Sequence, residues 1–392
     1  MKSSRDQLSY LWQQYATNRA TPAELDKLFD LLNDPAQDDE HFMMFREALS
    51  TVQQNEHLSS NSRDAMWNNI LHTAQIDTIP TTIAELKPLR RNTTIFRRAA
   101  AAAILVLLAT GLYLWQQPST TKKAIAKNTV PSGKAGAILT LADGSEISID
   151  SIGNGTIPPQ GGASAKLVNG TLVYESAGKE VVFNKMTTPK GRQFKLTLPD
   201  GSVVWLNAAS TIRYPTVFTG PERRVEIMGE AYLEVATNAA MPFRVATDNN
   251  TTIEVLGTSF NVNAYPNEAD MKTTLISGAI RVKHNKQTII VQPGQQVAQQ
   301  SEQLQLIKQV NIQQVIAWKD GFFNFDGVPL AELMRQLERW YDITVEYENG
   351  VPDITFGGKM SRQESLESLL KGLEESGVHY RLEGRKVIVI NK

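Results

Sequence analysis

The chain has 392 residues, of which 40 are Lys or Arg and 41 are Asp or Glu, so its formal net charge is -1. This length predicts two or three domains, and the balanced charge gives no electrostatic reason to expect direct nucleic-acid binding. The absence of cysteine excludes disulfides, thiol catalysis and zinc–thiolate sites, and the five histidines lack a metal-ligand spacing. We therefore expect no metal and no cofactor.

Residues 1–76 are predicted to form a small all-α bundle. Apolar residues from Leu8 to Tyr15 recur at helical spacing, and Thr21 and Glu24 form a capping box that opens a second helix. Two further apolar stripes follow, the last around Trp67. Helices this short either bury one another or complete their core against a partner.

Residues 97–116 are predicted to form one transmembrane helix, after a linker at 77–96. The 17 residues 99–115 carry no charge and would span roughly 26 Å as a helix. The span is marked by Ala99, Ile104, Leu108 and Trp115. Five Lys or Arg residues precede it and three follow, which favours a cytoplasmic N-terminus. A buried core helix is the alternative interpretation.

A second linker, 117–136, leads to a predicted all-β domain at 137–310. Short strand-like runs alternate there with Gly, Asn, Asp and Pro. This pattern is typical of a β-roll, a solenoid or a sandwich. Asp143-Gly144 and Asp200-Gly201 follow similar strands, so both aspartates are interpreted as turn residues rather than catalytic acids.

Residues 316–392 are predicted to form a small α/β sandwich in the order βαββαββ. One helix carries Leu330, Leu333 and Leu337 on one face, and a second helix is expected after a capping box at 361–364. The chain would close with a hairpin whose turn contains Gly384. Helices would cover one face of one sheet.

Several phrases in the second half occur in an order that resembles the FecR-type transmembrane anti-sigma factors of cell-surface signalling. They are LPDGSVVWLNAAS (198–210), GEAYLEV (229–235), MPFRVAT (241–247), VLGTSFNVNAY (255–265) and PGQQV (293–297). WKDGFFNF (318–325) and LERWYDITVEY (337–347) resemble the appended C-terminal domain of that family, which is similar to the short N-terminal domain of TonB-dependent receptors and secretins.

The resemblance implies a transducer in the bacterial inner membrane, with a cytoplasmic N-terminus and a periplasmic C-terminus. Its cytoplasmic domain would bind an extracytoplasmic-function sigma factor, and its periplasmic domains would sense the signalling domain of a TonB-dependent outer-membrane receptor. Intramembrane and periplasmic proteases are further implied partners. Release of the sigma factor or proteolysis, and inhibition or assistance, are alternatives that the residues leave open.

The expected contacts with these two partners follow from apolar stripes, exposed charges and strand edges. The sigma factor is expected to contact aromatic and leucine residues of the helical domain, namely Leu11, Trp12, Tyr15, Leu28 and Trp67. The receptor is expected to pair with the closing strand 386–390, taken as a sheet edge, and with charges on the preceding helix. These residues are Arg335, Glu338, Arg339, Arg385, Lys386, Ile388 and Ile390.

Two other classes of protein compete with the transducer. A membrane-anchored periplasmic scaffold would suit the C-terminal domain, but it gives no reason for a helical domain at the N-terminus. A carbohydrate-active enzyme or lectin would draw on the carboxylates Glu222, Glu226, Glu230 and Glu234. No catalytic triad, metal cluster or phosphate-binding glycine loop accompanies them. We therefore expect no catalytic site.

Overall fold

The computed structural model describes residues 10–11, 14–15, 19–32, 130–152, 155–176, 180–248 and 250–391. Among these residues, no helix is long and apolar enough to cross a membrane. The predicted transmembrane helix 97–116 lies outside the described residues, as do linker 77–96 and the stripe around Trp67.

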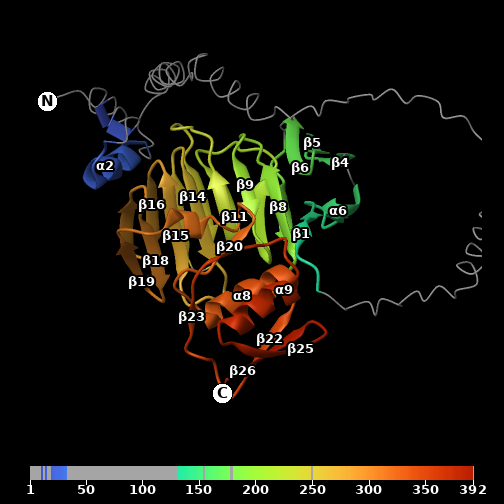
Figure 1. Ribbon diagram of the computed structural model, residues 1–392. Coiled ribbons are helices and arrows are strands. Elements are labelled where there is room, and N and C mark those ends of the chain that lie inside the picture. The colour runs from blue at the N-terminus through green and yellow to red at the C-terminus, as the bar shows by residue number, and fades with distance from the viewer. Residues whose placement is uncertain are drawn as a thin grey trace, which may run out of the picture. The chain divides into compact units, whose positions relative to one another are not determined.

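The predicted all-β domain is present and forms a two-layer β body that divides at strand β11 (Figure 1). One layer contains β3 (Glu146–Ser148), β2 (Ile138–Thr140), β7 (Phe183–Thr188), β10 (Ser210–Pro215), the first half of β11 (Arg223–Glu234), β12 (Phe243–Thr247), β13 (Thr251–Val255), β16 (Ile280–His284) and β17 (Gln287–Val291).

The other layer contains β4 (Gly155–Gln160), β5 (Ala163–Val168), β6 (Thr171–Ser176), β8 (Arg192–Thr197), β9 (Val203–Leu206), the second half of β11, β14 (Ser259–Ala264), β15 (Met271–Ser277), β18 (Gln296–Gln300) and β19 (Gln303–Ile307). β1 (Lys134–Ala135) pairs in parallel with β8, and the one-turn helix α6 (Ile149–Ile152) follows β3. Alternate side chains of both layers form one apolar core.

Gly229 is the residue at which β11 passes from one layer to the other. Before it, β11 pairs with β10 and β12, and after it the same strand pairs with β9 and β14. Gly229 has a φ of +87°, and a Cβ there would lie 2.5 Å from Oγ of Ser210. The sequence predicted two strands, 224–228 and 231–235, because the bend at this glycine resembles a turn.

The two Asp-Gly turns have the geometry expected from the sequence. Gly144 and Gly201 have φ values of +85° and +84°, and each preceding aspartate accepts the backbone N–H two residues later. The interpretation of Asp143 and Asp200 as turn residues is confirmed. Asp200 also accepts a 2.7 Å hydrogen bond from the buried guanidinium of Arg223.

The C-terminal module has both predicted helices, but its order is ββαβββαββ rather than βαββαββ, because the short strands β21 and β24 are added, and its strands do not form a single sheet. Its elements are β20 (Phe322–Asn324), β21 (Val328–Pro329), α8 (Leu330–Tyr341), β22 (Thr344–Glu348), β23 (Thr355–Phe356), β24 (Lys359–Ser361), α9 (Leu366–Glu375), β25 (His379–Glu383) and β26 (Lys386–Ile390). They form the pairs β20–β24 and β21–β23 and a three-stranded sheet in the order β22-β26-β25. The N-cap of α9 is Ser365 rather than the predicted box at 361–364, because Ser361 belongs to β24.

The prediction that strand 386–390 forms a sheet edge is wrong. β26 lies in the centre of its sheet, parallel to β22 and antiparallel to β25. The final strand returns between two earlier ones, so a terminal position in the chain is not an edge position in the sheet. Its apolar run Val387, Ile388 and Val389 is buried, as a central strand requires.

Helix α2 (Pro22–Leu32) begins at the predicted capping box and packs on the β body (Figure 1). Leu25, Leu28 and Phe29 of α2 contact a group that includes Leu256 and Ala279. Arg281 of β16 pairs with two aspartates one turn apart on α2, Asp26 at 3.1 Å and Asp30 at 3.0 Å. In the structure, the α2 stripe is therefore covered by the β body. Of the other predicted helices, only residues 10–11 and 14–15 of the first are described, and they are helical.

Candidate functional site

The C-terminal module joins the β body through a buried polar junction centred on Arg362. Arg362 is 3% exposed, and its Nη1 donates to the carbonyl of Trp318 at 3.0 Å. Its Nη2 donates to Oδ1 of Asn207 in the β body at 2.9 Å. The guanidinium stacks 3.7 Å from the ring centroid of Trp340, which is itself buried. Burial lowers the pKa of Arg362 to about 10.

Glu230 is the buried carboxylate on the β-body side of this junction. Oε2 accepts from Asn207 at 2.7 Å, and Oε1 accepts from Asn261 at 3.0 Å and from Asn263 at 3.4 Å. Burial raises the pKa of Glu230, although the amide donors and the nearby Arg339 and Arg362 act in the opposite direction. Asn207 links this carboxylate to Arg362, so the network crosses from the β body to the module.

A second link across the junction is the pair of arginines on α8. Arg335 and Arg339 donate to the two carboxylate oxygens of Glu268, at 2.6 Å and 2.7 Å respectively. Arg339 also stacks 4.0 Å from the ring of Tyr265. Both arginines had been predicted as exposed receptor contacts. Instead they face the β body, and Arg339 is only 7% exposed.

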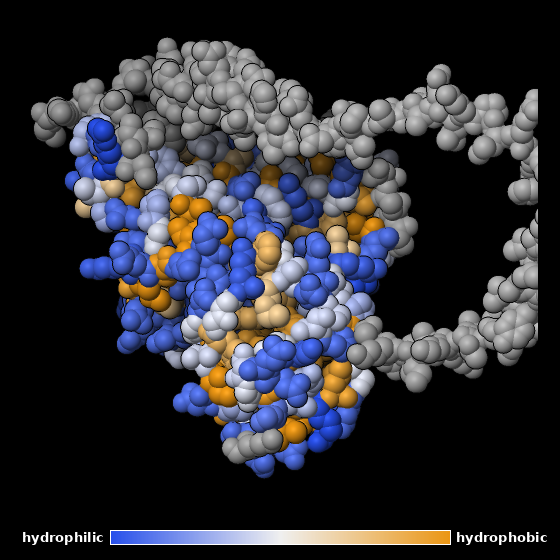
Figure 2. Space-filling model, in the orientation of Figure 1, coloured by the Kyte–Doolittle hydropathy of each residue, from blue (hydrophilic) through white to orange (hydrophobic). Residues whose placement is uncertain are grey.

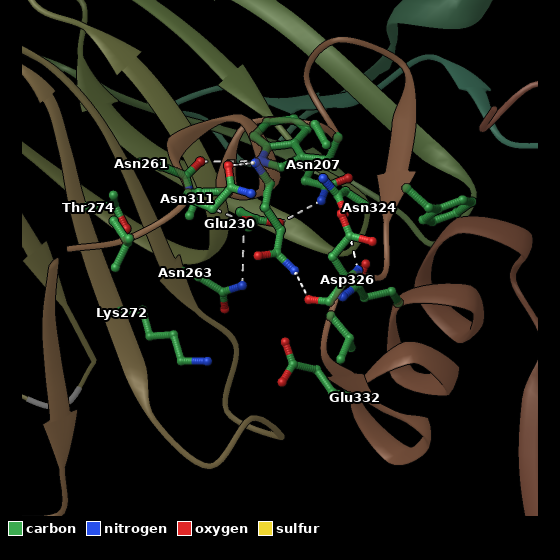
Figure 3. A pocket seen from close by; sticks show the side chains of 18 of the residues that line it. Asn207, Glu230, Asn261, Asn263, Lys272, Thr274, Asn311, Asn324, Asp326 and Glu332 are labelled. Carbon is green, nitrogen blue, oxygen red and sulfur yellow. Dashed lines mark hydrogen bonds between the residues drawn. The ribbon is translucent and has the colours of Figure 1, made fainter. Parts of the chain in front are cut away.

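A cleft of about 420 Å³ lies beside the junction (Figure 3). Strands β14, β15 and β18 line one side with Asn261, Asn263, Lys272, Thr274 and Gln296. The opposite side comes from the one-turn helix α7 (Ile312–Val315), from the chain around β20 and β21, and from α8. That side contributes Asn311, Gln314, Asn324, Asp326, Glu332 and Gln336.

The remaining predicted receptor contacts lie on the three-stranded sheet or beside it. Glu338 accepts the backbone N–H of Val345 at 2.9 Å, and Arg385 donates to the carbonyls of Tyr341 and Asp342. Lys386 pairs with Glu346 at 2.6 Å across β26 and β22. Ile388 is buried and Ile390 half-buried on the same central strand. The structure thus gathers these residues in one module, but not along an open edge.

The predicted sigma-factor contacts are only partly described. Leu11 and Leu28 are buried, and Tyr15 donates to the carbonyl of Gly257 at 2.7 Å. Burial raises the pKa of Tyr15 to about 12. Trp12 and Trp67 lie outside the described residues.

Sequence reasoning did not identify Arg362, Asn207 or Glu268, which make the junction. Each is a polar residue whose partner lies 67 to 155 positions away in the chain, a separation no local pattern encodes. The only local signal is an asparagine at the end of an apolar strand, Asn207 after Val203–Leu206. Two of the carboxylates considered for catalysis have different environments. Glu226 is exposed and pairs with Arg213, whereas Glu230 is buried in the junction.

Comparison with known families and structures gives matches over this same region. The family model described as FecR protein matches residues 184–281, and the one described as FecR, C-terminal, matches residues 322–389. No curated protein matches the chain.

Two solved structures resemble the chain. They are crystal structures of a candidate anti-sigma factor from Parabacteroides distasonis ATCC 8503, determined at 1.65 and 2.50 Å resolution. They are 32% and 31% identical to this chain, each with a TM-score of 0.50. The matches cover 53% and 54% of this chain and 99% and 100% of the solved chains.

Proposed function

The chain belongs to the FecR family of anti-sigma factors, and from that premise we propose that it is a single-pass transducer of the bacterial inner membrane. Its N-terminal helices bind an extracytoplasmic-function sigma factor in the cytoplasm. Its β body and C-terminal module respond in the periplasm to the signalling domain of a TonB-dependent receptor. Family membership makes the protein regulatory.

The observation that carries this proposal is the junction between the β body and the module. A module tethered by a flexible linker could bind a receptor without affecting the rest of the chain. Here Arg362 bonds to Asn207, and Glu268 pairs with both Arg335 and Arg339, so the two parts share buried charged hydrogen bonds. A receptor that displaces the module must therefore break these bonds or move the strands that carry them.

In a chain that crosses the membrane once at 97–116, α2 and the β body cannot be in contact. A helix at 97–116 would put α2 and β16 on opposite sides of the membrane, whereas Arg281 and Asp26 are in contact in the structure. Insertion would expose Leu25, Leu28 and Phe29 of α2. We propose that this apolar face is the surface that binds the sigma factor, because it is built to pack against a partner outside its own helix.

At the receptor end, β25 is the better edge for docking. Among the described strands β22 pairs only with β26, but Glu338 already accepts the N–H of Val345 on its other side. β25 pairs only with β26 among the described strands, and its residues Arg381 and Glu383 are exposed. Over the face seen in Figure 2, hydrophobic residues reach the surface in small groups among hydrophilic ones. Strand addition suits such a surface, because main-chain hydrogen bonds supply the affinity.

Pull-down with the two ends of the chain tests the proposal. Residues 1–96 should retain the sigma factor encoded beside the gene, and residues 129–392 should retain the signalling domain of the neighbouring receptor. Exchanging the two baits provides the control. A scaffold would retain neither partner, and retention of the sigma factor by residues 129–392 would contradict the proposed division of roles.

A further inference from the structure

The cleft beside the junction has a lining that the transducer function does not explain. Its volume of about 420 Å³ falls within the range of small-molecule sites, about 300–1,000 Å³. It opens between the β body and the module, and the residues that link these two parts, Arg362 and Glu268, belong to its wall.

Eight of the 25 residues that line the cleft carry side-chain amides. Five asparagines and three glutamines contribute: Asn207, Asn261, Asn263, Asn311, Asn324, Gln296, Gln314 and Gln336. An amide offers both donors and an acceptor, so such a lining suits a ligand whose groups can also do both. Hydroxyl groups have this property. Figure 3 shows the labelled amides drawn from both sides of the cleft.

The charges of the lining are largely matched within the protein. Glu230 accepts from three asparagines, and Glu268 pairs with two arginines. Lys272 lines the side of the cleft opposite Asp326 and Glu332. Most of the amides bond to the protein through one end, as Gln314 does to the carbonyl of Asp326 and Gln296 to Thr274. An anionic ligand would meet these carboxylates, and an apolar ligand would cover the remaining amide atoms without giving them a partner, at a cost of about 1–3 kcal/mol each. A neutral polar ligand avoids both penalties.

Two buried polar atoms in the lining residues have no hydrogen-bond partner among the described residues. One is Nε of Arg362, a donor in a side chain that is 3% exposed, and the other is Oδ1 of Asn263, an acceptor. Buried polar groups are usually paired. Both atoms are shielded from solvent, so they mark unused hydrogen-bonding capacity in the wall of the cleft rather than exposed contacts for a ligand.

We propose that this cleft binds a small neutral polyhydroxylated molecule, a mono- or disaccharide. The cleft lies between the β body and the module, so such a ligand would contact both sides of the junction directly. The proposal adds a small-molecule input to the protein, and it does not depend on binding of a sigma factor or of a receptor.

Binding of saccharides to the purified full chain tests the proposal. The protein is kept in a detergent without a sugar headgroup and titrated calorimetrically with a panel of neutral mono- and disaccharides at up to about 10 mM. At least one sugar should bind with one site per chain. No heat from any sugar in the panel would overturn the proposal, as would preferential binding of the phosphorylated forms.

Substitutions locate the site. Asn263→Ala and Gln336→Ala should each weaken binding of that sugar by about tenfold, the effect of one or two lost hydrogen bonds. The matched control is Gln305→Ala on β19, an exposed amide outside the cleft, which should bind like the parent. Unfolding temperatures without sugar verify that the variants fold. Equal affinity in all three variants would place the sugar elsewhere and overturn the assignment.

Discussion

Nη2 of Arg362 donates a 2.9 Å hydrogen bond to Oδ1 of Asn207, which joins the C-terminal module to a strand end 155 positions earlier in the chain. The same amide donates from Nδ2 to Glu230 at 2.7 Å. Asn207 therefore uses both ends of its amide, one toward the module and one toward the β body. Its position makes the junction a single network rather than two adjacent contacts.

The first prediction concerns the stability of this junction. Arg362→Met keeps an unbranched side chain of similar length but removes the hydrogen bonds to Trp318 and Asn207. The free energy of unfolding should fall by about 2–4 kcal/mol, because charged hydrogen bonds are lost in a buried site. Urea unfolding followed by tryptophan fluorescence measures this. The control Arg381→Met, in a side chain that is 52% exposed, should change stability by less than about 1 kcal/mol.

The second prediction is a pH dependence centred on Glu230. Burial raises the pKa of Glu230 in the folded protein above its ordinary value of 4.5, so the folded state holds this proton more tightly than the unfolded state. This group's contribution to stability is therefore fully present below about pH 4.5 and is lost as the pH rises through the raised pKa. Glu230→Gln should remove that decline.

Stability curves over this pH range compare Glu230→Gln with Glu226→Gln, a substitution on the same strand β11. Glu226 is exposed and pairs with Arg213, so its variant should keep the parent's slope. The measured quantity is the slope of stability against pH. Glu230→Gln also removes an acceptor for Asn207, but that loss lowers stability equally at every pH and so leaves the slope unchanged. Identical slopes in parent and Glu230→Gln would refute the prediction.

The strands and turns of the β body follow from local chemistry, and the sequence predicted most of them. Alternating apolar residues, as in Val203–Leu206, and Asp-Gly turns act over a few positions, so they can be read without the fold. The capping box at Thr21 and Glu24 is likewise local and is confirmed.

Strand order and the junction depend on contacts between distant parts of the chain. β26 pairs with both β22 and β25. The residues 386–390 do not by themselves determine which strands lie on either side of them. Arg335 and Arg339 have the spacing of a solvated helix face, yet Glu268 reaches them from 67 and 71 positions away. Patterns in α8 therefore indicated the helix but gave the wrong environment for its charges.

The third prediction concerns binding of the sigma factor by α2. Phe29→Ala should weaken binding by about 2 kcal/mol or more, because a large buried aromatic side chain is a typical interface anchor. Lys27→Ala, exposed on the same helix, is the matched control and should bind like the parent. Calorimetry with residues 1–96 measures both affinities, and circular dichroism verifies that helicity is unchanged. Unchanged binding by a helical Phe29→Ala variant would exclude this face.

The fourth prediction uses the absence of cysteine to test topology. Reporters fused at Thr82 and after Lys123 should be active on the cytoplasmic and periplasmic sides respectively. In membranes, the double variant Asp26→Cys and Arg281→Cys should not be linked by a flexible bis-maleimide, because the proposed span separates positions that are in contact in the structure. Arg213→Cys with Glu226→Cys, both on the β body, should be linked in the same preparation. Crosslinking of the first pair within one chain would contradict the proposed topology.

The last prediction concerns the edge at which the receptor docks. Ile388→Pro would disrupt a central strand, so loss of signalling in that variant would report unfolding of the module rather than a lost contact.

Single cysteines avoid this difficulty. Arg381→Cys on β25 and Glu346→Cys on β22 replace exposed residues on opposite outer strands. If strand addition uses β25, a thiol-to-amine crosslinker should join the receptor's signalling domain to Arg381→Cys and leave Glu346→Cys unlinked. Both variants should keep the parent's unfolding temperature, since neither side chain lies in the core. Linkage through Glu346→Cys instead would assign docking to β22, with Glu338 displaced from Val345.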